Sequence, residues 1–280
     1  MRLGQSAILF CLIAAPAWAR TYHYSWWSDN PRPYLEAIQK VNAAAPIKLG
    51  PDQRVRAGIV THHFLASGLM VQFFAALGTS PETIILIGPN HFHHGSANIS
   101  FSSLPWKTPF GVIATNLDIV HQLMAATNLP EDPEAFTGEH SVGVLIPFLK
   151  YYFPRSRVVP VLIDVNAREN DLRELRPLLA RFLANPQLLV VLSMDFFHDS
   201  VVSIADSRDR ATQQAILELD ADKVSELNVD CLRGLWLLLA SLRDLGQVKV
   251  QFNEHTNSAQ LTGNPHQSNV TSYFTMYFIK

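Results

Sequence analysis

Three histidines lie within four positions, directly after a run of apolar residues. Residues 83–87 are apolar or β-branched, and Gly88-Pro89-Asn90 separates them from His91, His93 and His94. A continuously apolar run is typical of a strand buried in a parallel sheet, and Gly-Pro ends such a strand. Imidazole is the commonest metal ligand and titrates near neutral pH. We therefore expect metal or acid–base chemistry at the carboxyl end of this strand, where ligands bind in open α/β sheets.

Two further apolar runs, residues 56–61 and 188–193, also lead into histidines. If the three runs form neighbouring parallel strands, their carboxyl ends share one edge of the sheet, and side chains that follow them converge there. The residues after these two runs that can carry chemistry are His62, His63, Asp195 and His198.

Two other segments carry residues that can reach the same edge. Glu139 and His140 open a helical segment, and Cys231 stands at the start of a later helix, where the helix dipole favours a thiolate. Imidazole nitrogens with one anionic ligand suit zinc, iron or copper better than magnesium or calcium, and they leave coordination positions open, as in catalytic sites. Asp195, three residues before His198, can fix the tautomer of an imidazole.

Each of these residues also has a purely structural interpretation. A single histidine is more often a hydrogen-bonded structural residue, and His63, His93 and His94 are expected to be neighbours of the site, because adjacent side chains point apart. A lone cysteine such as Cys231 is more often a small core residue. Paired with a histidine, it could instead act as a thiol nucleophile, which is the main competing enzyme hypothesis. The sequence has no Gly-x-Ser-x-Gly elbow and no glycine-rich phosphate loop.

The elements that position these residues predict one α/β domain. Residues 56–88 read as a strand, a helix over 66–77 and a second strand, the unit from which parallel sheets are built. Pro147 should kink or reset the helical segment that follows His140. Residues 253–269 read as a polar loop. Further strands are expected at 97–101, 158–163, 248–252 and 271–278, and further helices at 34–43, 117–126, 170–183, 207–226 and 230–245.

Composition narrows the function classes. The 280 residues are 48% apolar and 16% charged, with a formal net charge of −2 and no basic run, so no nucleic-acid partner is expected. Arg2, an apolar stretch at 7–15 and Ala17-Trp18-Ala19 form the three parts of a secretory signal. We expect residues 1–19 to be removed, leaving a periplasmic or secreted domain of residues 20–280 without a stable membrane anchor and with Cys231 as its single cysteine.

Several segments together resemble the Memo-like family, known in bacteria as AmmeMemoRadiSam system protein B. The resemblance covers the chain from about Tyr34 to the C-terminus. The segments that carry it, in order, are Ile85 to His91, Trp106-x-Thr108-Pro109-x-Gly111, Glu139-His140-Ser141 with Pro147-Phe148-Leu149, Ser193-x-Asp195-Phe196-x-His198, and Cys231.

This resemblance implies a fold related to the class III extradiol (LigB-like) dioxygenases, with a central, mostly parallel sheet flanked by helices. It implies His62, His91 and Cys231 as metal ligands, and Asp195 and His198 as additional catalytic residues, with His198 corresponding to the acid/base histidine. His140, Glu139 and His63 are expected to support the pocket. The implied cofactor is a transition metal ion, copper or iron, with zinc as a further candidate. A metal-dependent oxidoreductase follows as the expected function.

Two departures from the family pattern bear on this expectation. The family's Pro-His-Ala-Gly-Tyr is Thr61-His62-His63-Phe64 here, so either His62 or His63 can be the ligand. Export would also separate this protein from the radical-SAM and AMMECR-type partners of the family. The alternative functions are a non-catalytic protein that binds a small molecule or a peptide in the same pocket, and a hydrolase dependent on the Cys231 thiol.

Overall fold

The computed structural model describes residues 29–42, 49, 53–78, 80–198 and 201–280. The expected signal peptide, residues 1–19, lies outside the described residues. Among the helices of the described part, none has the length and apolar character needed to cross a membrane.

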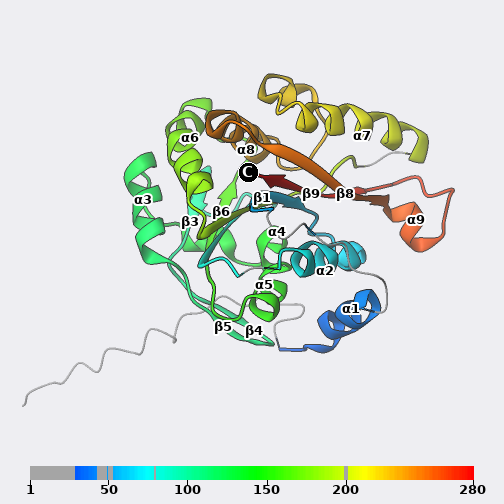
Figure 1. Ribbon diagram of the computed structural model, residues 1–280, viewed down its shortest axis with the longest axis horizontal. Helices are drawn as coiled ribbons and strands as arrows, with labels where there is room; N and C mark the ends of the chain where they lie inside the picture. The colour runs from blue at the N-terminus through cyan, green and yellow to red at the C-terminus, as the bar shows by residue number, and fades with distance from the viewer. Residues whose placement is uncertain (1–28, 43–48, 50–52, 79, 199–200) are drawn as a thin grey trace, which may run out of the picture.

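A seven-stranded sheet forms the centre of the molecule (Figure 1), with the strand order β3-β6-β2-β7-β1-β9-β8. The four strands β6, β2, β7 and β1 are parallel to one another, and β3, β9 and β8 pair in antiparallel fashion. The predicted α/β fold with a mostly parallel central sheet is therefore confirmed. The strands of the sheet are β1 (Val55–Val60), β2 (Thr83–Pro89), β3 (Ile99–Phe101), β6 (Arg157–Ile163), β7 (Leu188–Ser193), β8 (Lys249–Asn257) and β9 (Ser272–Ile279).

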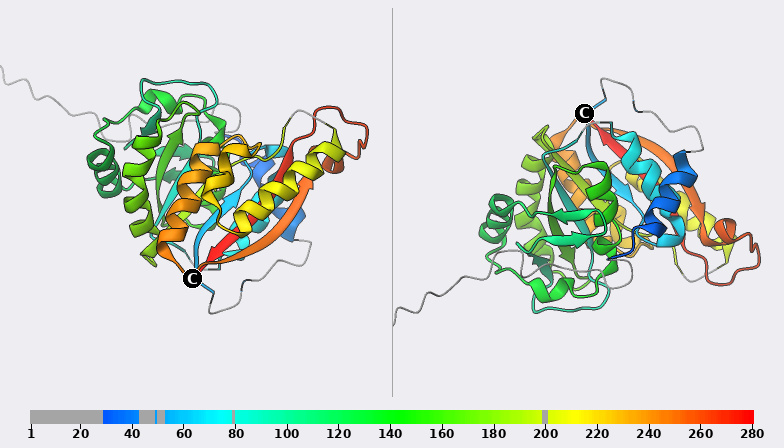
Figure 2. Two further views of the ribbon diagram at one scale, coloured as in Figure 1. Left: turned by 90° about the horizontal axis from the view of Figure 1, so that it is seen from above. Right: turned by 90° about the horizontal axis from the view of Figure 1, so that it is seen from below.

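Alternate residues of the buried strands face two layers of helices. In β2, Ile85 and Ile87 pack in the layer of α3, α6 and α8, whereas Ile84 and Leu86 pack in the layer of α1, α2 and α5. Figure 2 shows the two layers from opposite sides. Burial on both faces explains the continuously apolar runs of the sequence. The helices of the layers are α1 (Arg32–Asn42), α2 (Ser67–Ala76), α3 (Leu117–Thr127), α5 (Ile146–Tyr152), α6 (Glu169–Ala184) and α8 (Leu232–Leu245).

Pro147 resets the helical segment after His140, as predicted. The chain forms the short helix α4 (His140–Gly143) and then α5, in which Pro147 lies in the first turn. A proline is tolerated at that position because the first backbone N–H groups of a helix have no partner within the helix. The break lets α4 present its own amino-terminal residues to the end of β2.

Two predictions about the elements are wrong in their bounds. The expected helix 207–226 is α7 (Val202–Leu217) followed by a 3-10 helix (Ala221–Glu226), because the chain turns at Leu219 with a φ of 52°. The expected loop 253–269 is partly regular, since β8 continues along β9 and places His255 opposite Phe274, and α9 (Ser258–Thr262) follows. Residues 106–113, for which no element was predicted, form a hairpin of β4 (Trp106–Thr108) and β5 (Gly111–Ile113).

Candidate metal centre

Three strand ends and the starts of two helices, α4 and α8, meet at the carboxyl edge of the sheet. β7 lies between β2 and β1, so the residues that follow these three parallel strands are neighbours. Three imidazole rings gather there: the ring centroids are 5.1 Å apart for His62 and His91, 5.3 Å for His62 and His140, and 4.2 Å for His91 and His140. The second helix start brings in Asp230 and Cys231, which directly precede α8.

His62 is oriented by two serines. The hydroxyl of Ser193 donates to the backbone carbonyl of Ser141, so its oxygen is left to accept a hydrogen bond from Nδ1 of His62 at 3.0 Å. This arrangement places the proton of neutral His62 on Nδ1 and leaves the lone pair of Nε2 available. The side chain of His62 is only 2% exposed, so its tautomer is set by these protein contacts.

His91 is oriented by a buried carboxylate. Glu139 accepts a hydrogen bond from the backbone N–H of His91 at 2.8 Å through Oε2, and it contacts Nδ1 of the same residue at 2.9 Å through Oε1. Oε1 also accepts from the backbone N–H of Ser141, as a helix cap. A carboxylate on Nδ1 keeps the proton there and turns the lone pair of Nε2 outward, as in carboxylate–histidine–metal arrangements.

The two Nε2 atoms face the same carboxylate oxygen. Oδ2 of Asp230 lies 3.2 Å from Nε2 of His62 and 3.6 Å from Nε2 of His91. Ligand atoms bound at zinc-like distances in a tetrahedral arrangement lie about 3.4 Å from one another. Each of these two distances is close to the spacing of two ligand atoms on one metal ion, so Asp230 is placed to share a metal ion with either imidazole.

Two overlapping groups of side chains in the described part of the chain can hold a metal ion. Each contains His62, and the ligand atoms within each group lie within 4.8 Å of one another. The groups are His62 with His91 and His140, and His62 with Asp195 and Asp230.

Opposite charges hold the side chains of the site together. Burial disfavours the charged form of His91, but hydrogen bonds to Asp230 and Glu139 outweigh burial and raise its pKa to about 9. Burial likewise opposes ionisation of Glu139, and the hydrogen bond to His91 nevertheless lowers the pKa of Glu139 to about 2. A metal ion would replace the protons on the two Nε2 atoms as the positive charge in the site.

His140 differs from the other two histidines. Burial and the nearby charges of His62 and His91 lower its pKa to about 4, so the imidazole is neutral at pH 7. Its ring stacks on His91 with an interplanar angle of 21°. His140 thus stacks on the His91 ring and contributes a neutral imidazole to the cluster.

Cys231 packs in the hydrophobic core beside the site. The residue is 2% exposed, and a Cβ added at Gly234 would come within 2.6 Å of its Sγ and 2.9 Å of Leu192. Burial and the charge of Asp230 raise the pKa of the Cys231 thiol well above its usual value. Cys231 belongs to neither of the two ligand groups among the described residues, and its role as a ligand stays a prediction.

Asp195 ties the end of β7 to the end of β1. Its Oδ1 accepts hydrogen bonds from the hydroxyl of Thr61 and from the backbone N–H of His62, the latter at 3.1 Å. Its own backbone N–H donates to the carboxylate of Asp230 at 3.1 Å. Asp195 therefore positions both His62 and Asp230, and its Oδ2 lies 3.9 Å from Nε2 of His62.

His198 and His63 make their side-chain contacts with residues at the start of β9. Nδ1 of His198 is 3.4 Å from the hydroxyl of Thr271, and its Nε2 is buried and has no hydrogen-bond partner among the described residues. His63 contacts the hydroxyl of Tyr273 through Nδ1, and burial lowers its pKa. Of the two adjacent histidines, His62 faces Asp230 and His91, whereas His63 turns toward Tyr273.

His93 and His94 bond outside the cluster. Nδ1 of His93 lies 2.5 Å from Oδ2 of the buried Asp164, and the backbone of His93 has a φ of 52°. Nδ1 of His94 lies 3.3 Å from the carbonyl oxygen of Thr137. Neither is in a ligand group of the described chain.

Asp230 is the functional candidate that sequence reasoning missed. Acidic residues are common on protein surfaces, and Asp230 has no spacing relation to the histidines. Its position directly before Cys231 at a helix start was the one available signal. Only the packing of α8 against the sheet brings its carboxylate between His62 and His91.

Comparison with known proteins agrees with the family resemblance seen in the sequence. The chain is 25% identical over 266 residues to a MEMO1 family protein of Pyrobaculum aerophilum, covering 88% of this chain and 94% of that one. It is 24% identical over 261 residues to a MEMO1 family protein of Nitrosopumilus maritimus, covering 87% and 94%. The family model described as Memo-like protein matches residues 21–277. With this match over most of its length, the chain belongs to the Memo-like protein family.

Proposed function

We propose that this protein is a metal-dependent oxidoreductase whose metal ion is held by His62, His91 and the carboxylate of Asp230. The observation that carries the proposal is the position of Asp230 Oδ2, within 3.6 Å of Nε2 of both histidines. Two histidines and one carboxylate with open positions are typical of non-haem iron(II) oxygenases. Iron is therefore the expected metal, ahead of copper and zinc, and when bound it would supply the redox chemistry.

The residues around the ligands have separate tasks in this proposal. Glu139 and Ser193 fix the Nδ1 protons of His91 and His62, so that each Nε2 is free to bind. Asp195 positions Asp230 through its backbone N–H. His198 carries the one buried imidazole nitrogen near the site that lacks a hydrogen-bond partner in the described chain, and we assign it to accept or donate a proton at a bound substrate.

The thiol-dependent hydrolase is the less favoured alternative. A nucleophilic cysteine needs an exposed thiolate, and Cys231 is 2% exposed with a pKa raised by burial. The non-catalytic alternative, a protein that binds a small molecule or peptide in the same pocket, uses the same histidines. It differs in predicting metal or ligand binding without turnover.

Metal binding is the first test. Metal-free protein titrated anaerobically with Fe(II) should bind one ion per chain, and His91→Ala should lose at least about tenfold in affinity. His121→Ala is the matched control, since His121 is an exposed histidine on α3. Equal affinity of the native protein and His91→Ala would refute the ligand assignment.

Oxygen uptake is the second test. Protein loaded with Fe(II) and supplied with ascorbate as the electron donor should consume O₂ faster than the same concentration of free Fe(II), and His91→Ala should abolish the excess. A protein that binds iron with the expected stoichiometry but shows no excess uptake with iron or copper would support the non-catalytic binding function instead.

A further inference from the structure

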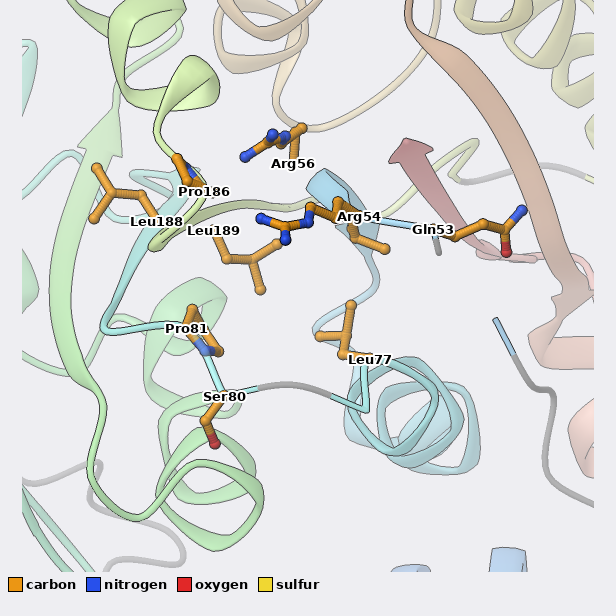
Figure 3. Close-up of a pocket in the computed structure, with 10 residues that line it drawn as sticks. Gln53, Arg54, Arg56, Leu77, Ser80, Pro81, Pro186, Leu188 and Leu189 are labelled. Carbon is orange, nitrogen blue, oxygen red and sulfur yellow. The ribbon is translucent and has the colours of Figure 1, made fainter. Parts of the chain in front are cut away.

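A cleft opens at the edge of the sheet opposite to the histidine cluster. It has a volume of about 330 Å³ and lies where β1 and β7 begin and where α2 is connected to β2 (Figure 3). The metal-centre residues follow the ends of the same parallel strands. The residues that line the cleft are Gln53, Arg54, Val55, Arg56, Leu77, Ser80, Pro81, Pro186, Leu188 and Leu189.

Two arginines contribute positive charge to this cleft. Arg56 lies in β1 and Arg54 directly precedes the strand, and Figure 3 shows both side chains extending toward the Pro186 and Leu189 side. Within the described residues, neither guanidinium pairs with a carboxylate, and Nε of Arg56 is buried without a hydrogen-bond partner. Burial and the charge of Arg54 lower the pKa of Arg56.

These two arginine side chains destabilise the folded protein when no ligand is bound. A buried N–H group without an acceptor loses its hydrogen bond to water and gains nothing in return. Two neighbouring guanidinium groups also repel each other. Both costs disappear when an anion accepts hydrogen bonds from the two side chains, because charge-assisted bonds to carboxylate or phosphate are the strong ones.

The remaining walls indicate what the anion is attached to. Among the described lining residues none is acidic. Besides the arginines, Gln53 and Ser80 are polar, and the apolar part of the wall is formed by Val55, Leu77, Leu188, Leu189 and two prolines. The volume lies at the lower end of the range of roughly 300–1,000 Å³ typical of small-molecule sites. A free inorganic ion would leave these apolar walls without a contact.

We propose that this cleft binds a small organic anion, a carboxylate or phosphate group joined to an apolar body, with Arg56 and Arg54 holding the anionic group. The site is separate from the metal centre, because the six residues of β1 set the two edges about 20 Å apart. The inference therefore does not depend on the proposed function.

Calorimetric titration of the full chain with three related probes tests the proposal. Benzoate and phenyl phosphate carry the two candidate anionic groups, and benzyl alcohol is the neutral counterpart. We expect both anions to bind with one site per chain and the alcohol not to bind. The tighter of the two anions identifies the preferred group.

Arginine variants locate the binding. Arg56→Gln and Arg54→Gln should each lower the affinity for the anions by about tenfold or more. Arg210→Gln makes the same change of charge at an exposed position on α7 and should leave the affinity unchanged. Arg54 is itself exposed, so its variant keeps the fold even if Arg56→Gln does not.

Three results would overturn the proposal: no binding of either anion by the native chain, unchanged affinity in the folded arginine variants, or equal binding of benzyl alcohol and benzoate.

Discussion

At the scale of single residues, the contact between Glu139 and His91 decides how well the site can hold a metal ion. The carboxylate is completely buried, bonds both the backbone and Nδ1 of His91, and caps α4. A neutral amide in its place can still accept a hydrogen bond from Nδ1 but loses the negative charge that makes the imidazole a better ligand.

We expect Glu139→Gln to weaken metal binding by roughly 10–100-fold, as for other changes of the residues that hold a metal-binding histidine. Competition with a chromogenic chelator measures the affinity. Glu134→Gln, an exposed residue of the same segment, is the control and should bind as the native protein does. Native-like affinity in Glu139→Gln would show that the His91 tautomer is fixed in another way.

The pH dependence of stability should differ between metal-free and metal-loaded protein. The pKa of His91 is raised from 6.5 to about 9, so its stabilising charge is fully present below pH 6.5 and is lost as the pH rises through 9. The pKa of Glu139 is lowered from 4.5 to about 2, so its contribution is present above pH 4.5 and lost as the pH falls toward 2.

Metal-free protein should therefore be most stable between about pH 4.5 and 6.5 and lose stability up to pH 9. Metal-loaded protein should show the opposite slope above pH 6.5, because the metal ion competes with protons for Nε2 and binds better as they leave. Denaturant unfolding across this range tests both slopes. Parallel curves with and without metal would contradict the assignment of the site.

At the scale of elements, the close approach of α4 to the end of β2 positions the cluster. A Cβ added at Gly88 would lie 2.8 Å from Oγ and 3.0 Å from Cβ of Ser141. Ser141 is the residue whose hydroxyl bonds the Pro89 carbonyl and whose own carbonyl accepts from Ser193. Gly88 therefore sets the spacing on which the orientation of His62 depends.

Gly88→Ala should lower the free energy of unfolding by about 1–3 kcal/mol through overpacking and weaken metal binding as well. Gly68→Ala is the matched control, since a Cβ there meets only Val41 at 3.8 Å and alanine favours the helix by about 1 kcal/mol. Chemical denaturation and metal titration of the two variants provide the measurement. Loss of stability with unchanged metal affinity would show that the spacing between α4 and β2 does not affect metal binding.

The sequence predicts the elements whose pattern is local. β2 and β7 are continuously apolar because both faces are buried, and Pro147 marks the start of α5, so these are readable without a structure. The course of β8 cannot be read from the sequence, because its polar residues from Glu254 to Thr256 are stabilised by pairing with the buried β9. The end of α7 is equally hidden, since no glycine or proline marks the turn at Leu219.

The same reasoning applies to the site. Histidines after apolar strands are a visible pattern, and His62 and His91 do lie together. The choice between His62 and His63 depends on which of the two side chains turns toward Asp230. The sequence carries no signal for that orientation. The carboxylate of Asp230 arrives through the packing of α8, a long-range contact without a sequence signature.

At the scale of the whole molecule, the parallel strands place the two proposed sites at the two edges of one sheet. The histidine cluster follows the carboxyl ends of β1, β2 and β7. The cleft lined by Arg54 and Arg56 lies where β1 and β7 begin. The apolar strands that run between the two sites position the residues of both. We expect variants of either site to affect the ligand of that site and to leave the other ligand bound.

Export is a proposal that concerns the chain as a whole. We propose that residues 1–19 are removed and that the remaining protein is periplasmic or secreted, on the three-part signal at the N-terminus. Mass measurement of protein recovered from the periplasm after expression of the full chain should give a chain that begins at Arg20. Recovery of the uncleaved chain from the cytoplasm alone would contradict this.

The central claim is that Asp230, rather than Cys231, is the third metal ligand beside His62 and His91. Absorption spectra of the Co(II)-loaded protein test it most directly, because a cysteine ligand produces an intense thiolate charge-transfer band and a carboxylate does not. We predict a native spectrum without that band, no change in Cys231→Ser, and at least about tenfold weaker Co(II) binding in Asp230→Asn. A thiolate band in the native protein that Cys231→Ser removes, with undiminished binding in Asp230→Asn, would contradict the account.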